Sequence, residues 1–191
     1  MNDSLTERLD EILPRITSDD FLNARGIGNE IAFFIFDFSP DAELQVREHI
    51  KFLLEQIPKK KPGLRVKHIN LLQFVVDHLR NRKLLEKTFE LQKQKGDAFV
   101  LKQLDKILHP EKLAPLFAEV AQPDQHDLVL VSGVGSVWPL MRTHSLLNNL
   151  HPIMGRTPLV MFYPGKYDMK TLRLFGKIKS DNYYRAFRLI P

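Results

Sequence analysis

The sequence contains no cysteine. A disulfide framework, a thiolate zinc site and a cysteine nucleophile are therefore excluded, and the absence fits a reducing compartment. No apolar run approaches the roughly 20 residues that a membrane helix needs, because the longest, residues 31–36, has the length of a strand. The first residues are polar and acidic, unlike a secretory signal. We therefore expect a cytoplasmic protein that makes no contact with a membrane.

Charge is distributed unevenly along the chain. The formal net charge is +5, yet residues 1–20 hold six acidic and two basic side chains, whereas residues 151–191 hold two acidic and eight basic ones. A basic segment attracts phosphate groups or an acidic partner, although a solvated surface is the simpler explanation. Its charge density is below that of a nucleic-acid-binding tail, so DNA binding is allowed but not required.

Length and patterning predict a single α/β domain over residues 1–191. The chain is 43% hydrophobic, which is enough for a full core. Strand-like segments alternate with helical ones and lie at residues 30–36, 64–69, 127–132, 158–163 and 183–190. This alternation predicts a mainly parallel central sheet of about five strands with helices on both faces. Residues 1–29 are expected to form an N-terminal helical segment, and residues 84–122 a helical insert within the domain.

Several residues indicate where helices begin. Ser18 and Asn70 are each expected to cap a helix, because a short side-chain oxygen accepts a free amide of the first turn. Ser39-Pro40 opens a helix over residues 41–57, with Leu44 on its apolar stripe.

Further boundaries of predicted elements lie after residue 132. A helix is predicted over residues 138–150, with Pro139 in its first turn, where a missing amide costs little. Residues 164–168 are predicted to form a loop after the fourth strand.

Ligands of parallel α/β sheets bind beyond the carboxyl ends of the strands. Those ends carry Asp37, Asn70 and residues 132–136 and 163–168. Asp37 stands where many α/β enzymes keep a catalytic carboxylate, and the alternative is that it caps the following helix. His144 is a candidate general base, and His144 and His151 could share a helix face, but no carboxylate is placed to complete a metal site.

A glycine-rich turn follows the third strand. Its glycines let backbone amides approach an anion, so the candidate anion-binding residues are Ser132, Gly133, Gly135, Ser136 and Arg142. The turn lacks the third glycine of a dinucleotide fingerprint, since Trp138 stands there, and it lacks the lysine of a Walker loop. A purely structural tight turn therefore remains the main alternative to anion binding.

Aromatic and basic residues gather in the last part of the chain. They are consistent with core packing, with a protein interface or with stacking on nucleic-acid bases. The candidate partner-binding residues are Tyr163, Arg173, Tyr183, Tyr184, Arg185 and Arg188.

Three longer segments together resemble the BrxB family. They are residues 132–148 (SGVGSVWPLMRTHSLLN), residues 158–165 (PLVMFYPG) and residues 182–188 (NYYRAFR). The resemblance extends over the whole chain. It implies a role in BREX (bacteriophage exclusion), a multi-gene antiphage system that includes a DNA methyltransferase, a large ATPase and the alkaline-phosphatase-like protein PglZ.

The resemblance supplies no catalytic residues, and the chain itself shows no complete catalytic motif. We therefore expect a non-enzymatic accessory or assembly subunit without a cofactor or metal, acting through contacts with other BREX proteins, PglZ first. Two alternatives remain. One is a degenerate nucleotide- or phosphate-binding domain that uses residues 132–136, and the other is weak DNA binding through the basic C-terminus.

Overall fold

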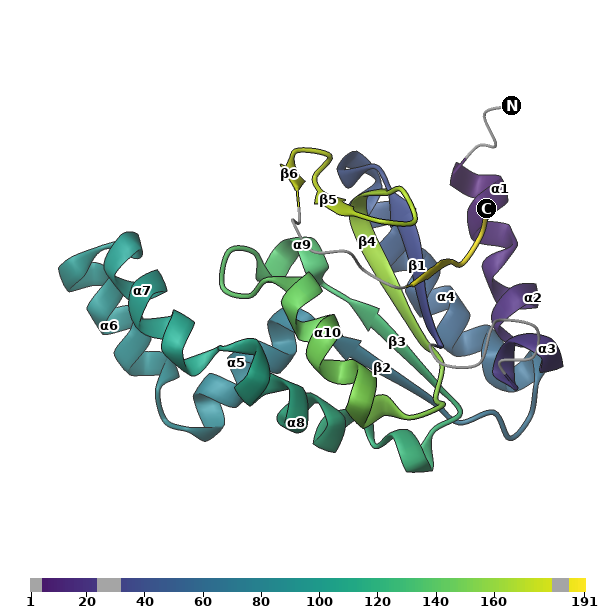
Figure 1. Cartoon of the computed structure of the whole chain (residues 1–191), viewed down its shortest axis with the longest axis horizontal. Coiled ribbons are helices and arrows are strands. Elements are labelled where there is room, and N and C mark those ends of the chain that lie inside the picture. The colour runs from purple at the N-terminus through teal and green to yellow at the C-terminus, as the bar shows by residue number, and fades with distance from the viewer. Residues whose placement is uncertain (1–4, 24–31, 180–185) are drawn as a thin grey trace.

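The structure is a computed structural model that describes residues 5–23, 32–179 and 186–191. Parallel strands form its centre (Figure 1). Within these residues the central strands run in the order β2-β3-β4-β1-β7. Their bounds are β1 Phe33–Phe38, β2 Val66–Asn70, β3 Leu128–Ser132, β4 Leu159–Tyr167 and β7 Phe187–Arg188. All of these neighbours pair in parallel. The expected α/β fold with a mainly parallel sheet is confirmed.

One face of the sheet is covered by the N-terminal helices and α4. These elements are α1 (Leu5–Asp10), α2 (Ile12–Ile16), α3 (Asp19–Leu22), the 3-10 turn η1 (Pro40–Ala42) and α4 (Glu43–Lys60). They bury Phe34 and Phe36 of β1 together with Leu130 of β3. Since α4 carries the chain from β1 to the distant edge strand β2, the next crossovers return across the other face.

The second face is covered by helices from the middle of the chain. They are α5 (Leu71–Asn81), α8 (Pro110–Ala121), α9 (Val134–Val137) and α10 (Thr143–Met154), with the 3-10 turn η2 (Pro123–Gln125) leading into β3. Phe33 and Ile35 of β1 and Val131 of β3 are buried on this side. Successive residues of β1 thus enter different cores, which explains its unbroken apolar sequence.

Two helices project from the body of the molecule. They are α6 (Leu85–Lys95) and α7 (Asp97–Ile107), and we call residues 85–107 the arm (Figure 1). Gly96, at a φ of +79°, reverses the chain between them. The inner part of α7 is anchored by Val100 and Leu104, which are buried in the core under α5 and α8.

The prediction that a helix begins at Trp138 is wrong. The chain enters the short helix α9 directly after Gly133, leaves it at Trp138 and begins α10 only at Thr143. Trp138 adopts an extended conformation, with φ −67° and ψ 137°, because a residue that precedes proline is disfavoured in the helical region. Pro139 therefore lies in an exposed turn and not in the first turn of a helix.

The loop predicted at residues 164–168 is mostly strand. β4 continues to Tyr167, and β5 (Leu172–Leu174) folds back antiparallel onto Gly165–Tyr167, with β6 (Ile178–Lys179) beyond it. A Cβ on Gly165 would collide with the backbone carbonyl oxygen of Arg173. Glycine at this position allows the two strands to approach closely, which is a common reason for a glycine within a strand.

The predicted caps are confirmed. Asn70 Oδ1 accepts hydrogen bonds from the amides of Leu72 (3.1 Å) and Gln73 (3.2 Å), and Ser18 Oγ accepts one from Phe21 (3.3 Å).

Leu44 is wrong as a buried position, because it is 74% exposed on α4. In the described part of the chain, no helix combines the length and the apolar character needed to cross a bilayer.

Candidate functional site

Asp37 lies within β1 at the carboxyl edge of the sheet and holds three segments together. Its carboxylate accepts hydrogen bonds from the Arg8 guanidinium of α1 (3.1 Å) and from the backbone amide of Tyr167 (3.0 Å). Arg188 Nε lies 4.0 Å from the same carboxylate, and this guanidinium also donates to the Tyr167 carbonyl. The Asp37 side chain is only 15% exposed. These contacts make it an anchor between the N-terminal helices, β4 and the C-terminal strand.

Both glycines of the turn are packed closely by side chains. Gly133 is buried at a φ of +74°, and a Cβ there would lie 2.6 Å from Asn70 Oδ1, the atom that caps α5. A Cβ on Gly135 would lie 3.0 Å from the Phe175 ring and from Pro164. The geometry therefore gives each glycine a packing role, as expected for a structural junction.

The serines of the turn are engaged by basic side chains that the sequence did not single out. Ser132 Oγ lies 2.8 Å from His68 Nε2 of β2, and Ser136 Oγ accepts a hydrogen bond of 2.9 Å from Arg47 of α4. Burial lowers the pKa of His68. A Ser–His pair is also the arrangement that activates a nucleophile, but Ser132 is 6% exposed, which restricts any approach of a substrate.

A small cavity of about 220 Å³ lies where α10 begins, between the turn at residues 138–142 and the β4–β6 hairpin. We call it the Trp138 pocket. Its described lining residues are Trp138, Arg142, Thr143, Tyr163, Leu174, Ile178 and Lys179. Arg142 and Tyr163, which the sequence assigned to an anion site and to a partner site respectively, meet here. Trp138, Thr143 and Lys179 carried no local signal that pointed to a shared site.

The remaining candidate partner residues do not form one exposed surface. Tyr163 is 4% exposed and Arg188 belongs to the Asp37 network, whereas Arg173 is exposed on β5. Tyr183, Tyr184 and Arg185 lie outside the described residues.

The two histidines on α10 give no catalytic or metal arrangement in the described residues. The His151 ring stacks on Phe33 with centroids 4.4 Å apart, and burial lowers its pKa. The side chain of His144 lies outside what the structure describes. Within the described residues, no group of three or more histidine, aspartate or glutamate side chains is placed to hold a metal ion.

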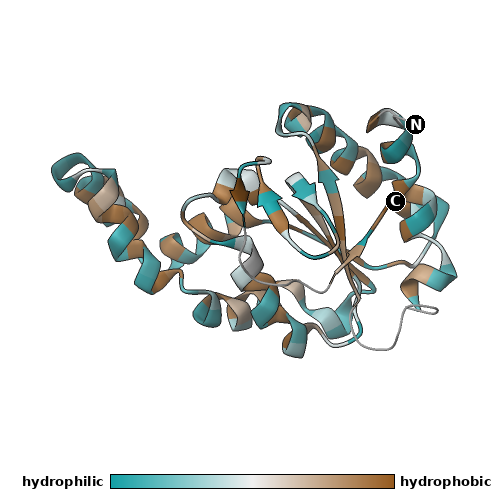
Figure 2. Cartoon of the chain, turned by 45° about the horizontal axis from the view of Figure 1, so that its top comes forward, coloured by the Kyte–Doolittle hydropathy of each residue, from teal (hydrophilic) through white to brown (hydrophobic). Residues whose placement is uncertain are grey.

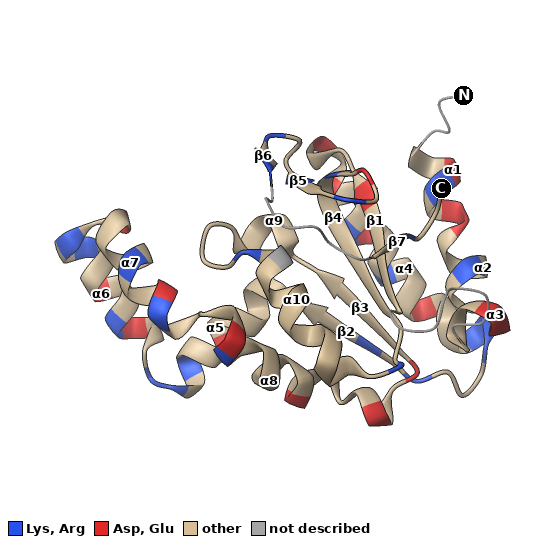
Figure 3. Cartoon of the chain, viewed as in Figure 1, with Lys and Arg blue, Asp and Glu red and all other residues tan. Residues whose placement is uncertain are grey.

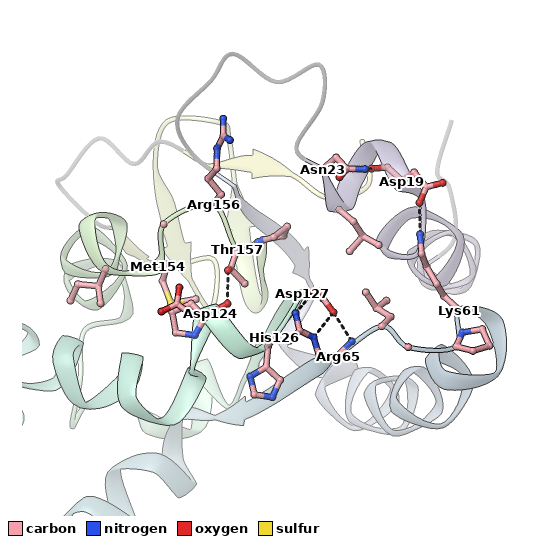
Figure 4. Close-up of a pocket in the computed structure, with 18 residues that line it drawn as sticks. Asp19, Asn23, Lys61, Arg65, Asp124, His126, Asp127, Met154, Arg156 and Thr157 are labelled. Carbon is pink, nitrogen blue, oxygen red and sulfur yellow. Dashed lines mark hydrogen bonds and ion pairs between the residues drawn. The ribbon is translucent and has the colours of Figure 1, made fainter.

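A wider groove of about 720 Å³ lies at the opposite edge of the sheet, at the amino ends of the strands (Figure 4). The Arg65 guanidinium binds both oxygens of Asp127, at 2.7 and 3.1 Å, and Lys61 donates to Asp19 at 2.5 Å. The hydrogen bond from Arg65 lowers the pKa of Asp127. Because these opposite charges satisfy one another, the groove offers no strong preference for an anionic or a cationic ligand.

Comparison with known proteins decides the family. The family model described as "BREX protein BrxB" matches residues 67–189. The chain belongs to the BrxB family. The matched region begins in β2 and includes the arm, the glycine turn and the Trp138 pocket. The resemblance noted in the sequence is thereby confirmed, and with it the setting of BREX phage defence.

Two curated BrxB relatives match nearly the whole chain. "BREX protein BrxB" of Bacillus cereus (strain H3081.97) is 42% identical over 190 residues, which are 97% of each chain. "BREX protein BrxB" of Escherichia coli O9:H4 (strain HS) is 41% identical over 187 residues, which are 98% of this chain and 92% of that one. No solved structure matches the chain.

Proposed function

We propose that this BrxB-family chain is a non-catalytic assembly subunit of a BREX phage-defence complex, and that its arm binds another BREX protein. PglZ is the first partner to test. The observation that carries the proposal is the outer part of the arm, which is helical without a core of its own.

The tip of the arm buries none of its side chains against the rest of the described structure. Every residue from Phe89 to Phe99 is exposed, and α6 has no buried residue at all. Helices of about 11 residues are marginal in water, because most helical stability in proteins comes from tertiary packing. A partner that packs against this tip would supply the missing contacts.

The composition of the tip suits a protein partner. Phe89, Leu91 and Phe99 are 47%, 36% and 40% exposed. In Figure 2 hydrophobic residues recur among hydrophilic ones along the projecting arm, and Figure 3 shows both basic and acidic residues on α6 and α7. Exposed aromatic side chains within a mixed-charge surface are typical of protein interfaces. A polyanion such as DNA would favour a surface of one sign.

The base of the arm extends this surface. A groove of about 670 Å³ runs between α7, the start of α8 and residues 138–142. Leu101 of α7 and Leu108, which directly follows α7, line one side, and Trp138 and Leu140 line the other. Polar and charged side chains, among them Lys102, Asp105 and Glu111, complete the lining, so the groove offers a partner segment a place of mixed character beside the exposed helices.

The engaged polar groups at the sheet edge support a non-catalytic role. Asp37 is bound by Arg8 and by the Tyr167 amide, and the Ser132 hydroxyl lies against His68. The side chains of Asp37 and Ser132 thus take part in contacts that hold the domain together.

The proposal is tested by co-purification from cells that express the complete BREX locus with an affinity tag on this chain. We expect PglZ or another BREX protein to be retained with the wild type. The double variant Phe89→Ala/Phe99→Ala should lose the partner, because truncating a hot-spot aromatic weakens binding by about thirtyfold or more.

Phe52→Ala is the matched control, since Phe52 on α4 is 46% exposed and lies outside the arm. This variant should retain the partner, and all variants should unfold at similar temperatures. Retention of the partner by the double variant at wild-type level, or capture of no BREX protein by the wild type, would contradict the proposal.

A further inference from the structure

We infer that the Trp138 pocket binds the phosphate group of a small molecule. This inference does not depend on the arm or on any protein partner. It rests on five groups that point to an oxyanion: two cationic side chains, a phenol that has no partner within the described residues, a threonine hydroxyl and the N-terminus of α10.

The polar lining of the pocket consists of hydrogen-bond donors. Arg142 and Lys179 supply positive charge from two segments that are far apart in the sequence, and Thr143 supplies a hydroxyl. None of the described lining residues is acidic. Arginine and lysine together favour an oxyanion, which accepts several charge-assisted hydrogen bonds at once.

Tyr163 is the decisive residue. Its side chain comes from β4, is 4% exposed and lines the pocket, and its hydroxyl has no hydrogen-bond partner among the described residues. A ligand atom in the pocket can therefore accept a hydrogen bond from this hydroxyl. Burial also raises the pKa of Tyr163, so the phenol stays protonated and can donate to an anion at neutral pH.

The start of α10 adds to the same preference. Thr143 is the first residue of this 12-residue helix and is 6% exposed, and Arg142 is its N-cap residue without a side-chain capping bond. The free amides of a first helical turn and the helix dipole both favour a negative group.

The size of the pocket limits the ligand. Its volume of about 220 Å³ is below the roughly 300–1,000 Å³ of sites that enclose drug-sized molecules. Trp138, Leu174 and Ile178 form an apolar wall beside the donors. A phosphate group therefore fits within the pocket, and the two sources to separate are inorganic phosphate and the phosphate of a nucleoside monophosphate whose remainder would lie outside it.

This places an anion site next to the glycine turn and not within it. In the turn, the Asn70 side chain lies close to Gly133 and the Phe175 ring close to Gly135, whereas the Trp138 pocket is open to a ligand. Of the candidate anion-binding residues from the sequence, only Arg142 lies in this cavity.

The inference is tested by calorimetric titration and thermal unfolding of the full chain with inorganic phosphate, AMP or succinate at equal ionic strength. Phosphate should bind and raise the unfolding temperature through ligand linkage. A Kd for AMP more than tenfold below that for phosphate would identify a nucleotide, and equal values would identify phosphate itself. Binding of succinate alone, or of none of the three at 20 mM, would overturn the inference.

Substitutions at the pocket separate binding from folding. Tyr163→Phe should raise the Kd about tenfold, as expected for loss of one hydrogen bond to a charged group, without lowering the stability of the free protein. Tyr167→Phe is the control, because the Tyr167 hydroxyl donates to Ala186 in the core, so this variant should lose stability and keep the Kd.

Arg142→Gln should weaken phosphate binding at least tenfold, whereas Arg82→Gln, at an exposed site after α5, should not. Equal effects of Arg142→Gln and Arg82→Gln would show only general charge attraction and would also overturn the inference.

Discussion

Replacing Asp37 with asparagine should destabilise the domain by about 2–3 kcal/mol. The change keeps the side-chain volume and one acceptor oxygen, but it removes the charge that faces Arg8 at 3.1 Å and Arg188 at 4.0 Å. Loss of one partner from a buried ion pair costs about 3–5 kcal/mol. The exposure of Arg8 and Arg188, 20% and 36%, reduces this range because water screens the charges.

Urea unfolding followed by circular dichroism measures this change. For a chain of this size, about 2–3 kcal/mol corresponds to a fall of roughly 5–10 °C in the unfolding temperature. Glu48→Gln is the control, because Glu48 and Lys51 form an exposed pair, 71% and 67% accessible, whose loss should cost less than about 0.5 kcal/mol.

A double-mutant cycle with Arg8→Gln sharpens the test. If Asp37 and Arg8 act as one unit, the two losses should be non-additive by about 1–3 kcal/mol. Unchanged stability of Asp37→Asn would refute the anchor role. Unchanged stability combined with lost phage defence would instead indicate that Asp37 has a chemical role.

Three further predictions concern local features. Gly133→Ala should cost about 2–3 kcal/mol in thermal unfolding, because an L-residue is strained at a φ of +74° and its Cβ displaces the capping oxygen of Asn70; a loss below 0.5 kcal/mol would argue against this close packing. Burial lowers the pKa of His68, so protonation of this histidine favours the unfolded state. The free energy of unfolding should therefore decrease as the pH is lowered from about 7 to about 5. His68→Gln should make this decrease smaller. Tyr167→Phe should lose about 1–2 kcal/mol, because the Ala186 carbonyl loses a donor at 2.6 Å; a wild-type unfolding midpoint would refute this.

Local chemistry was sufficient to predict several elements of the fold. The capping oxygens of Ser18 and Asn70 and the buried run of β3 depend on neighbours in the sequence, and these features appear where they were expected. The start of α10 was missed because two local rules compete at residues 138–139. Proline favours the first turn of a helix, but it also pushes the preceding Trp138 into an extended conformation, and the second effect prevails.

The strand β4 illustrates the limit of local patterns. Pro164 and Gly165 are typical of a loop, yet β5 pairs with this segment and extends the strand. Such pairing depends on a segment later in the chain, so no pattern within residues 164–168 predicts it.

The candidate site was predicted only in part, for a similar reason. The parallel topology correctly places Asp37, Asn70 and the glycine turn at one edge of the sheet, since the register aligns Asn70 with Ser132. The partners of these residues, Arg8 and His68, come from distant segments and carry no motif. The Trp138 pocket combines residues from α10, β4 and β6, so its donors could be recognised together only in three dimensions.

Amide hydrogen exchange of the arm, in the free chain and in a purified BREX complex, tests the assembly role most directly. In the free chain the amides of residues 89–99 should exchange fast, because every residue of this helical tip is exposed. In the complex the same amides should become protected, while those of the exposed helix surface around Phe52 keep their rates. A complex that contains this chain and leaves the exchange of residues 89–99 unchanged would contradict the account.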